Sequence, residues 1–168
     1  MKNLLPHLLK KTLPQSIALL FFVVLSCALK AQNNNQELTL VPVNFKVQST
    51  SETGAKFVID ITNNSALTHE LNLTIDNNIS GIENPDDSNS SGNVELKFSF
   101  IDFNSKQKIE SIQLNAGQTY RFILVAQSSD TTPLKRWNCS RLSINSITDP
   151  SVSSSLVLHT YVRDLTEE

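Results

Sequence analysis

The chain has 168 residues, of which 39% are hydrophobic and 18% charged, and its formal net charge is −2. Binding to nucleic acid needs clustered Lys and Arg side chains. The longest basic cluster here is Lys135-Arg136, with Arg141 nearby. Composition and charge therefore exclude nucleic acid as an expected partner, and the length is that of one domain with a short extension.

The first 31 residues predict an export signal. Lys2, Lys10 and Lys11 precede an unbroken apolar run at 17–25, and small residues follow that run. The run is too short to span a hydrocarbon core of roughly 30 Å. We therefore expect a signal peptide helix at 1–31 and an exported protein, either periplasmic or extracellular.

Two processing routes remain open. Cleavage after Ala31 would leave Gln32 as the new N-terminus, and this ending resembles signal ends common in exported proteins of the Bacteroidetes. Alternatively, Cys27 closes a lipobox and carries a lipid, which would make the protein an outer-membrane lipoprotein. Leu25 is bulky for a lipobox, which favours the first route. Either way a membrane is an expected partner only if Cys27 is lipidated.

Removal of residues 1–31 makes the chain more acidic. Four of the 14 Lys and Arg residues, and none of the 16 Asp and Glu residues, lie in this segment, so the net charge becomes −6. A charge of this sign favours solubility.

After a polar lead-in at 32–36, which we expect to be flexible, apolar residues recur at every second position. This period is typical of half-buried β-strands. Pro42 predicts an edge strand or a bulge, and the strand around Phe122 is apolar on both faces, which predicts a central position. The expected strands lie at 38–47, 57–61, 71–75, 94–100, 109–114, 120–126 and 156–162, with an irregular one at 137–148.

These seven or eight strands predict an all-β fold. Their spacing is typical of a sandwich, and no segment after residue 31 has sustained helical periodicity. Two antiparallel sheets packed face to face would bury the apolar side of each strand. We expect this antiparallel β-sandwich to span 37–164 and to be followed by an acidic tail at 165–168.

Three stretches resemble immunoglobulin-like domains of bacterial secreted and surface proteins, including the CARDB and fibronectin type III groups. They are a strand ending in Asn-rich turn residues at 56–65, a hairpin at 112–122 whose Gly117 precedes a strand, and a closing strand at 157–162. The resemblance covers most of 37–164. It implies an immunoglobulin-like sandwich used for adhesion, binding or spacing between catalytic modules, and it transfers no functional residue.

The segment 77–93 interrupts the alternation with many turn-forming residues. A loop of this length is usually functional or disordered. Its Glu83, Asp86 and Asp87 offer oxygen ligands of the kind that calcium prefers, although their spacing matches no known calcium loop. A solvated acidic turn is the alternative interpretation.

No catalytic motif is present, so we expect neither an enzyme nor a cofactor. His69 lies in a polar turn and is expected to be solvated, and His159 is expected on the surface of the last strand. One Cys and two distant His cannot form a zinc site of standard spacing. We expect Cys139 to be buried. We also expect Trp137 in the core, with a binding anchor at a sheet end as the alternative.

The sequence therefore predicts an exported, non-catalytic β-sandwich module. Its expected role is binding or structural, at the cell envelope or outside the cell, with an unidentified protein or carbohydrate as partner. The alternative is an assembly subunit of a surface structure that associates through edge strands such as 38–47. An enzyme is the third and least favoured class.

Overall fold

The computed structural model describes residues 36–51 and 53–166. The predicted signal peptide, its cleavage point between Ala31 and Gln32, the lipidation candidate Cys27 and most of the lead-in lie outside the described residues. Within the described part of the chain, no helix is long and apolar enough to cross a membrane.

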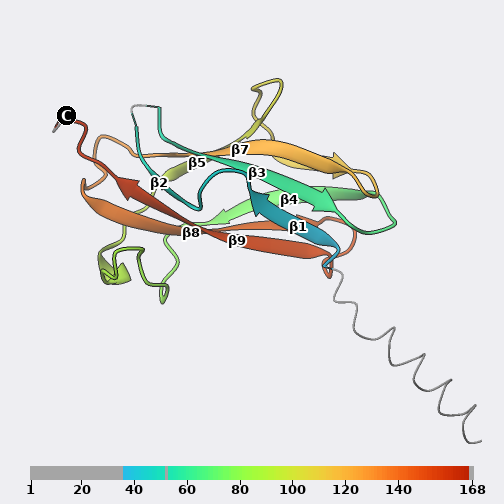
Figure 1. Ribbon diagram of the computed structural model, residues 1–168, viewed down its shortest axis with the longest axis horizontal. Helices are drawn as coiled ribbons and strands as arrows, with labels where there is room; N and C mark the ends of the chain where they lie inside the picture. Colours follow the sequence, from blue (N-terminus) through green and yellow to red (C-terminus); the bar gives the residue numbers. More distant parts are fainter. Residues whose placement is uncertain (1–35, 52, 167–168) are drawn as a thin grey trace, which may run out of the picture. The chain divides into compact units, whose positions relative to one another are not determined.

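The described residues form two β-sheets (Figure 1). The four-stranded sheet has the order β1 (Leu38–Pro42), β3 (Ala55–Asn63), β7 (Thr119–Gln127), β5 (Lys97–Asp102). The five-stranded sheet has the order β2 (Val47–Ser49), β9 (Ser153–Val162), β8 (Arg136–Ser146), β4 (His69–Asp76), β6 (Ser111–Leu114). One short 3-10 helix, η1 (Ser90–Gly92), lies in the longest loop.

The strand order makes the sandwich immunoglobulin-like. β1, β3, β7 and β5 take the places of immunoglobulin strands A, B, E and D, and β4, β8 and β9 take those of C, F and G. The predicted all-β sandwich is therefore confirmed. Two details differ: the described residues form nine strands rather than seven or eight, and β2 pairs with β9 in parallel rather than antiparallel.

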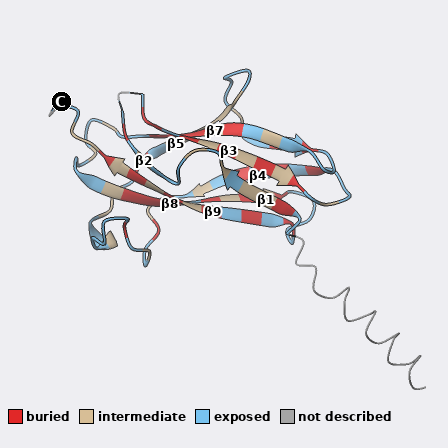
Figure 2. Cartoon of the chain, viewed as in Figure 1, coloured by how far each residue is buried: buried red, intermediate tan, exposed pale blue. Residues whose placement is uncertain are grey.

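The core lies between the two sheets, where alternate residues of each strand meet (Figure 2). In β3, Phe57, Ile59 and Ile61 are fully buried, and Leu142 and Ile144 of β8 are equally buried in the other sheet. Each such side chain contributes about 1.5–3 kcal/mol relative to an exposed one. β7 lies between β3 and β5, so its predicted central position is confirmed.

β8 has polar residues on its inward-facing side. Asn138 and Ser140 belong to the same alternating series as Leu142 and are buried. The Asn138 amide donates to Asn77 Oδ1 at 2.8 Å and to the Val94 carbonyl at 2.7 Å, and its own oxygen accepts from the Ser140 hydroxyl. These bonds offset the cost of burying the amide.

The expected single strand at 38–47 is in fact two strands in different sheets, so that prediction was wrong. β1 ends at Pro42, and β2 begins at Val47 on the other sheet. The Asn44 side chain bonds the Val58 N–H and the Lys56 carbonyl, which the backbone of a continued strand would otherwise bond. The edge position predicted from Pro42 is confirmed, because β1 is the outer strand of its sheet.

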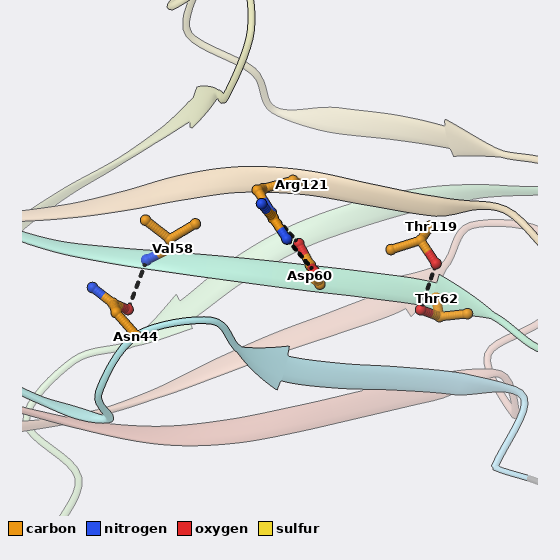
Figure 3. Close-up of polar contacts among 6 residues, drawn as sticks. All are labelled: Asn44, Val58, Asp60, Thr62, Thr119 and Arg121. Carbon is orange, nitrogen blue, oxygen red and sulfur yellow. Dashed lines mark hydrogen bonds and ion pairs between the residues drawn. The ribbon is translucent and has the colours of Figure 1, made fainter.

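A side chain holds the segment between β1 and β2 in place. The Asn44 oxygen accepts the Val58 N–H at 3.0 Å (Figure 3). The Asn44 amide donates to the Lys56 carbonyl at 2.9 Å. The Val43 N–H also bonds the Val58 carbonyl at 2.8 Å. The segment is therefore anchored to β3 although it is not itself a strand.

Candidate functional site

The first surface of interest is residues 41–47, which we call the crossover segment. Its four large apolar residues stand at alternate positions and are all exposed: Val41 (50%), Val43 (48%), Phe45 (78%) and Val47 (41%). Single exposed apolar residues are common on protein surfaces, but four within seven residues are unusual and indicate an interaction site along this segment. Val41 lies beside Asp60 in the four-stranded sheet and Val47 beside His159 in the five-stranded sheet, so the row follows the edge of the sandwich.

The backbone of β2 has hydrogen-bonding groups that no other described residue bonds. The His159 N–H bonds the Lys46 carbonyl at 2.9 Å, and the Thr50 N–H bonds the Tyr161 carbonyl at 2.9 Å. In a parallel ladder this register directs the backbone groups of the intervening Val47 and Ser49 away from β9. The outer edge of the five-stranded sheet therefore offers donors and acceptors to a further strand.

The edge of β1 is less open to pairing. The backbone groups of its odd-numbered residues point towards β3. At its two ends, the Asn64 N–H donates to the Glu37 carbonyl and the Val43 N–H donates to the Val58 carbonyl. The alternation leaves Pro42 facing outward, where it has no N–H to donate. Of the two edge strands β1 and β2, β2 is therefore better able to pair with a strand of another polypeptide.

A hollow of about 560 Å³ lies next to β2. It is lined by the crossover segment, by β9 and by the longest loop. Its apolar lining residues are Val47, Ile82, Pro85, Leu156 and Val157. His159 lines it as well, with a buried Nδ1 that has no hydrogen-bond partner among the described residues. His159 lies on the outward-facing series of β9, as predicted, but it is half-buried there, and this burial lowers the pKa of its ring.

The second surface is the 77–93 loop, which folds over the outer side of the five-stranded sheet (Figure 1). Both of its ends bond β8: the Ile79 N–H donates to the Cys139 carbonyl and the Val94 N–H to the Trp137 carbonyl, each at 2.8 Å. Within the loop, the Asn84 and Asn93 side chains exchange two hydrogen bonds of 2.8 and 2.9 Å. The loop is ordered by these amide hydrogen bonds and by the buried side chain of Ile79.

Trp137 lies beneath this loop and not in the core, which corrects the prediction. It belongs to the outward-facing series of β8 and is half-buried. Its ring packs on Tyr161 of β9, with centroids 5.0 Å apart and planes inclined by 55°. Together with the loop, the two rings line a hollow of about 390 Å³. The alternative that we gave for Trp137, an anchor near a sheet end, fits this placement better.

The acidic residues of the loop do not gather around one point. Among residues 36–51 and 53–166, no three His, Cys, Asp or Glu side chains are placed to hold a metal ion together, and this includes Glu83, Asp86 and Asp87. The Asp86 carboxylate accepts from the Ser88 hydroxyl at 2.6 Å. This bond, followed by the nearby Trp137 N–H, lowers the pKa of Asp86. Calcium binding at the loop stays an untested prediction.

His69 was predicted to be solvated, and this was wrong. Only 3% of its surface is exposed. Its Nε2 lies 3.0 Å from the Ser65 hydroxyl and its Nδ1 lies 3.1 Å from the Ser146 hydroxyl. The two hydroxyls satisfy both ring nitrogens, which explains how a polar ring is tolerated inside the sandwich.

Cys139 is buried, as predicted. It lies on the outward-facing series of β8, where the loop residue Ile79 bonds its carbonyl. Burial raises the pKa of the Cys139 thiol. A neutral, covered thiol is a poor nucleophile and a poor metal ligand.

No protein-family model matches the sequence, and no curated protein matches it. Solved structures with a similar fold include the E. coli chaperone DraB, with 14% identity, a TM-score of 0.44 and coverage of 78% of this chain and 56% of that chain. A FixG-related protein from Vibrio parahaemolyticus has 6% identity, a TM-score of 0.45 and coverage of 76% and 95%. The Salmonella enterica SafA pilin–SafB chaperone complex gives 12% identity, a TM-score of 0.42 and coverage of 78% and 56%.

The chain spans little more than half the length of the DraB chain that it matches. Likeness at these identities and TM-scores concerns the fold alone, and no residue correspondence is drawn from it. The description of the fold as immunoglobulin-like rests on the order of the strands in the two sheets. The narrower resemblance to the CARDB and fibronectin type III groups stays a prediction.

Proposed function

We propose that the chain is an exported, non-catalytic assembly module that binds an extended segment of another polypeptide along the outer edge of β2. The observation that carries the proposal is the crossover segment, where four exposed apolar side chains adjoin the unpaired backbone groups of Val47 and Ser49. Strand addition uses both features: backbone groups give affinity, and side-chain contacts give specificity.

The surroundings of β2 fit an added strand. The Asn44 side chain fixes the crossover segment to β3, so Phe45 is presented from an ordered backbone. The hollow beside Val47 and His159 has room for an apolar side chain of the partner. An ordered, preformed edge reduces the entropy lost on binding.

The proposal favours the assembly role over a purely structural one. A spacer has no need for a row of exposed apolar residues, which is a liability for aggregation when nothing covers it. The partner is a polypeptide in either case, whether a second copy of this chain or a different protein, and the experiment below distinguishes the two sources by mass.

The test is site-specific photo-crosslinking in the native host. A photoreactive amino acid replaces Phe45, and the matched control replaces Leu134, which is also an exposed apolar residue (50%) but lies outside the crossover segment. We expect a discrete adduct from position 45 and none from position 134. An adduct of twice the chain mass identifies a second copy, and any other mass identifies a different protein.

A charge substitution provides the second arm. Phe45→Lys should abolish the partner's capture at a reporter placed at Val43, whereas Leu134→Lys should leave it intact. Absence of an adduct at position 45, or equal adducts at positions 45 and 134, would overturn the proposal.

A further inference from the structure

The hollow beneath the 77–93 loop is a second candidate binding site. It shares no lining residue with the crossover segment. Its volume of about 390 Å³ lies within the ordinary range of small-ligand sites. The groups that line it are of three kinds: aromatic rings from the sheet, hydrogen-bonding side chains from the loop, and the cationic Lys135 and Arg136 next to the start of β8.

The aromatic wall comes from the sheet. Trp137 and Tyr161 are cross-strand partners in β8 and β9, so their positions are fixed by the backbone register. Both are half-buried, and both line the hollow. Rings held in this way offer apolar faces at little cost in conformational entropy, because the sheet already orders them.

The polar wall comes from the loop. Asn84, Asp86 and Asn93 line the hollow from one side, and Arg136 lines it from the start of β8. The mutual bonds of Asn84 and Asn93 hold this wall in shape, and Asn84 is only 3% exposed. An ionised carboxylate only accepts hydrogen bonds, amides both donate and accept, and a guanidinium only donates.

The Trp137 indole adds an unusual feature. Its Nε1 is buried and makes no hydrogen bond within the described part of the chain. The Asp86 carboxylate is close enough for this N–H to lower the pKa of Asp86. A buried donor without an acceptor costs free energy, so a ligand oxygen that accepts this N–H would stabilise the complex.

We infer that this hollow binds a neutral saccharide, with a sugar ring lying on the Trp137–Tyr161 wall and its hydroxyls bonded to the Asp86 carboxylate, the Asn84–Asn93 pair and Arg136. The C–H face of a sugar ring matches an aromatic surface, and its hydroxyls match a wall of mixed donors and acceptors. The inference is independent of the proposed function.

Other ligand classes fit less well. An apolar molecule would suit the aromatic wall, but it would displace water from the charged Asp86 and Arg136 side chains without replacing it. An anion would meet charges of both signs, because Asp86 lines the hollow together with Lys135 and Arg136, and the chain without residues 1–31 has a net charge of −6. A neutral ligand rich in hydroxyl groups meets neither cost.

The experiment uses the only tryptophan of the sequence as its reporter. The protein is screened on an array of neutral glycans, and each sugar that binds is then titrated while the Trp137 fluorescence is recorded. Glucose, galactose, mannose, N-acetylglucosamine and their short oligomers are titrated in any case, up to about 10 mM, which reveals dissociation constants in the millimolar range. We expect a saturable change in the intensity or wavelength of the emission.

Asp149 provides a matched control for Asp86. Asp86 Oδ1 accepts the N–H and hydroxyl of Ser88 at 3.1 and 2.6 Å, and Asp149 Oδ1 accepts the same two groups of Ser151 at 3.0 and 2.6 Å. Asp86→Asn should weaken saccharide binding by about tenfold or more, whereas Asp149→Asn should leave it unchanged.

Tyr161→Leu, with its fold checked by circular dichroism, should weaken binding as well, because it removes part of the aromatic wall. If this variant does not fold, the comparison of Asp86→Asn with Asp149→Asn still tests whether the saccharide binds in this hollow. Absence of any neutral saccharide binding, binding without a change in Trp137 fluorescence, or equal binding by the Asp86→Asn and Asp149→Asn variants would overturn the inference.

Discussion

Trp137 and Tyr161 pack against each other on the outer side of the five-stranded sheet, with ring centroids 5.0 Å apart and planes inclined by 55°. The only tryptophan of the chain therefore contributes to a surface hollow and not to the core. The fully buried phenylalanine, leucine and isoleucine side chains between the sheets instead contribute most of the hydrophobic stabilisation of the fold.

This arrangement predicts unequal costs for two aromatic substitutions. Phe57→Ala removes a fully buried ring and should lower the free energy of unfolding by about 3–5 kcal/mol. Trp137→Phe keeps an aromatic ring at a half-buried position and should cost about 1 kcal/mol or less. Urea denaturation of both variants checks this, and a larger loss for Trp137→Phe than for Phe57→Ala would contradict the position of the core.

A second prediction concerns the thiol of Cys139. Because Cys139 is buried and its thiol pKa is raised, a water-soluble thiol reagent at neutral pH should react with it only slowly in the folded protein. In denaturant the reaction should become rapid. The measurement uses a Cys27→Ala variant, so that Cys139 is the only thiol. Rapid labelling in the folded protein would show that the 77–93 loop does not cover this part of the sheet.

A third prediction concerns the buried amide of Asn138. Asn138→Ala leaves Asn77 Oδ1, the Val94 carbonyl and the Ser140 hydroxyl without their partner. It should lower the free energy of unfolding by about 1–3 kcal/mol. The exposed Asn72 of β4 is the control, and Asn72→Ala should stay within about 0.5 kcal/mol of the parent. Equal effects of the two substitutions would contradict the buried network.

A fourth prediction links stability to pH through the hydrogen bond that Tyr120 donates to Asp102. The bond lowers the pKa of Asp102 to about 2. Burial and the same carboxylate raise the pKa of Tyr120 to about 12. The stabilisation from Asp102 is therefore present above the ordinary pKa of 3.8 and is lost as the pH falls from there towards 2.

The tyrosine acts at the other end of the pH scale. Its stabilisation is complete below the ordinary pKa of 10 and is lost as the pH rises towards 12. Tyr120→Phe should flatten the stability profile in both windows, because it removes the shared bond. Denaturation midpoints recorded across the pH range check this, and profiles of unchanged shape in the variant would refute the coupling.

The fold class could be read from the sequence because most strands alternate strictly. The series Phe57, Ile59 and Ile61 has the period of a half-buried strand, and the structure places all three in the core. The central position of β7 followed from its apolar residues on both faces. These are local signals, and the tertiary structure reinforces them.

Other elements could not be read in this way. β8 is the longest strand, but its inward-facing Asn138 and Ser140 interrupt the apolar alternation. Only the hydrogen bonds of Asn138 to Asn77 and Val94, which are distant in sequence, make those positions acceptable. His69 was missed for the same reason, because its two serine partners become visible only in three dimensions.

The crossover segment shows a further limit of pattern analysis. Its Val43, Phe45 and Val47 alternate with the same period as Leu38 and Leu40 of β1, although shifted by one residue, and we therefore predicted one long strand. In the structure these side chains are exposed, and the chain passes from one sheet to the other. An alternating apolar pattern indicates that one side of a segment is suited to burial. It does not indicate whether that side is buried in the core of the same domain or against a partner.

The most direct test of strand addition at β2 is amide hydrogen exchange at Val47 and Ser49. The exchange rates are measured in the free chain and in the complex with the partner trapped from position 45. The account predicts rapid exchange in the free chain, because both N–H groups point away from β9, and slowing by about tenfold or more in the complex, because they bond the added strand. Unchanged exchange at both amides in the complex would contradict the account.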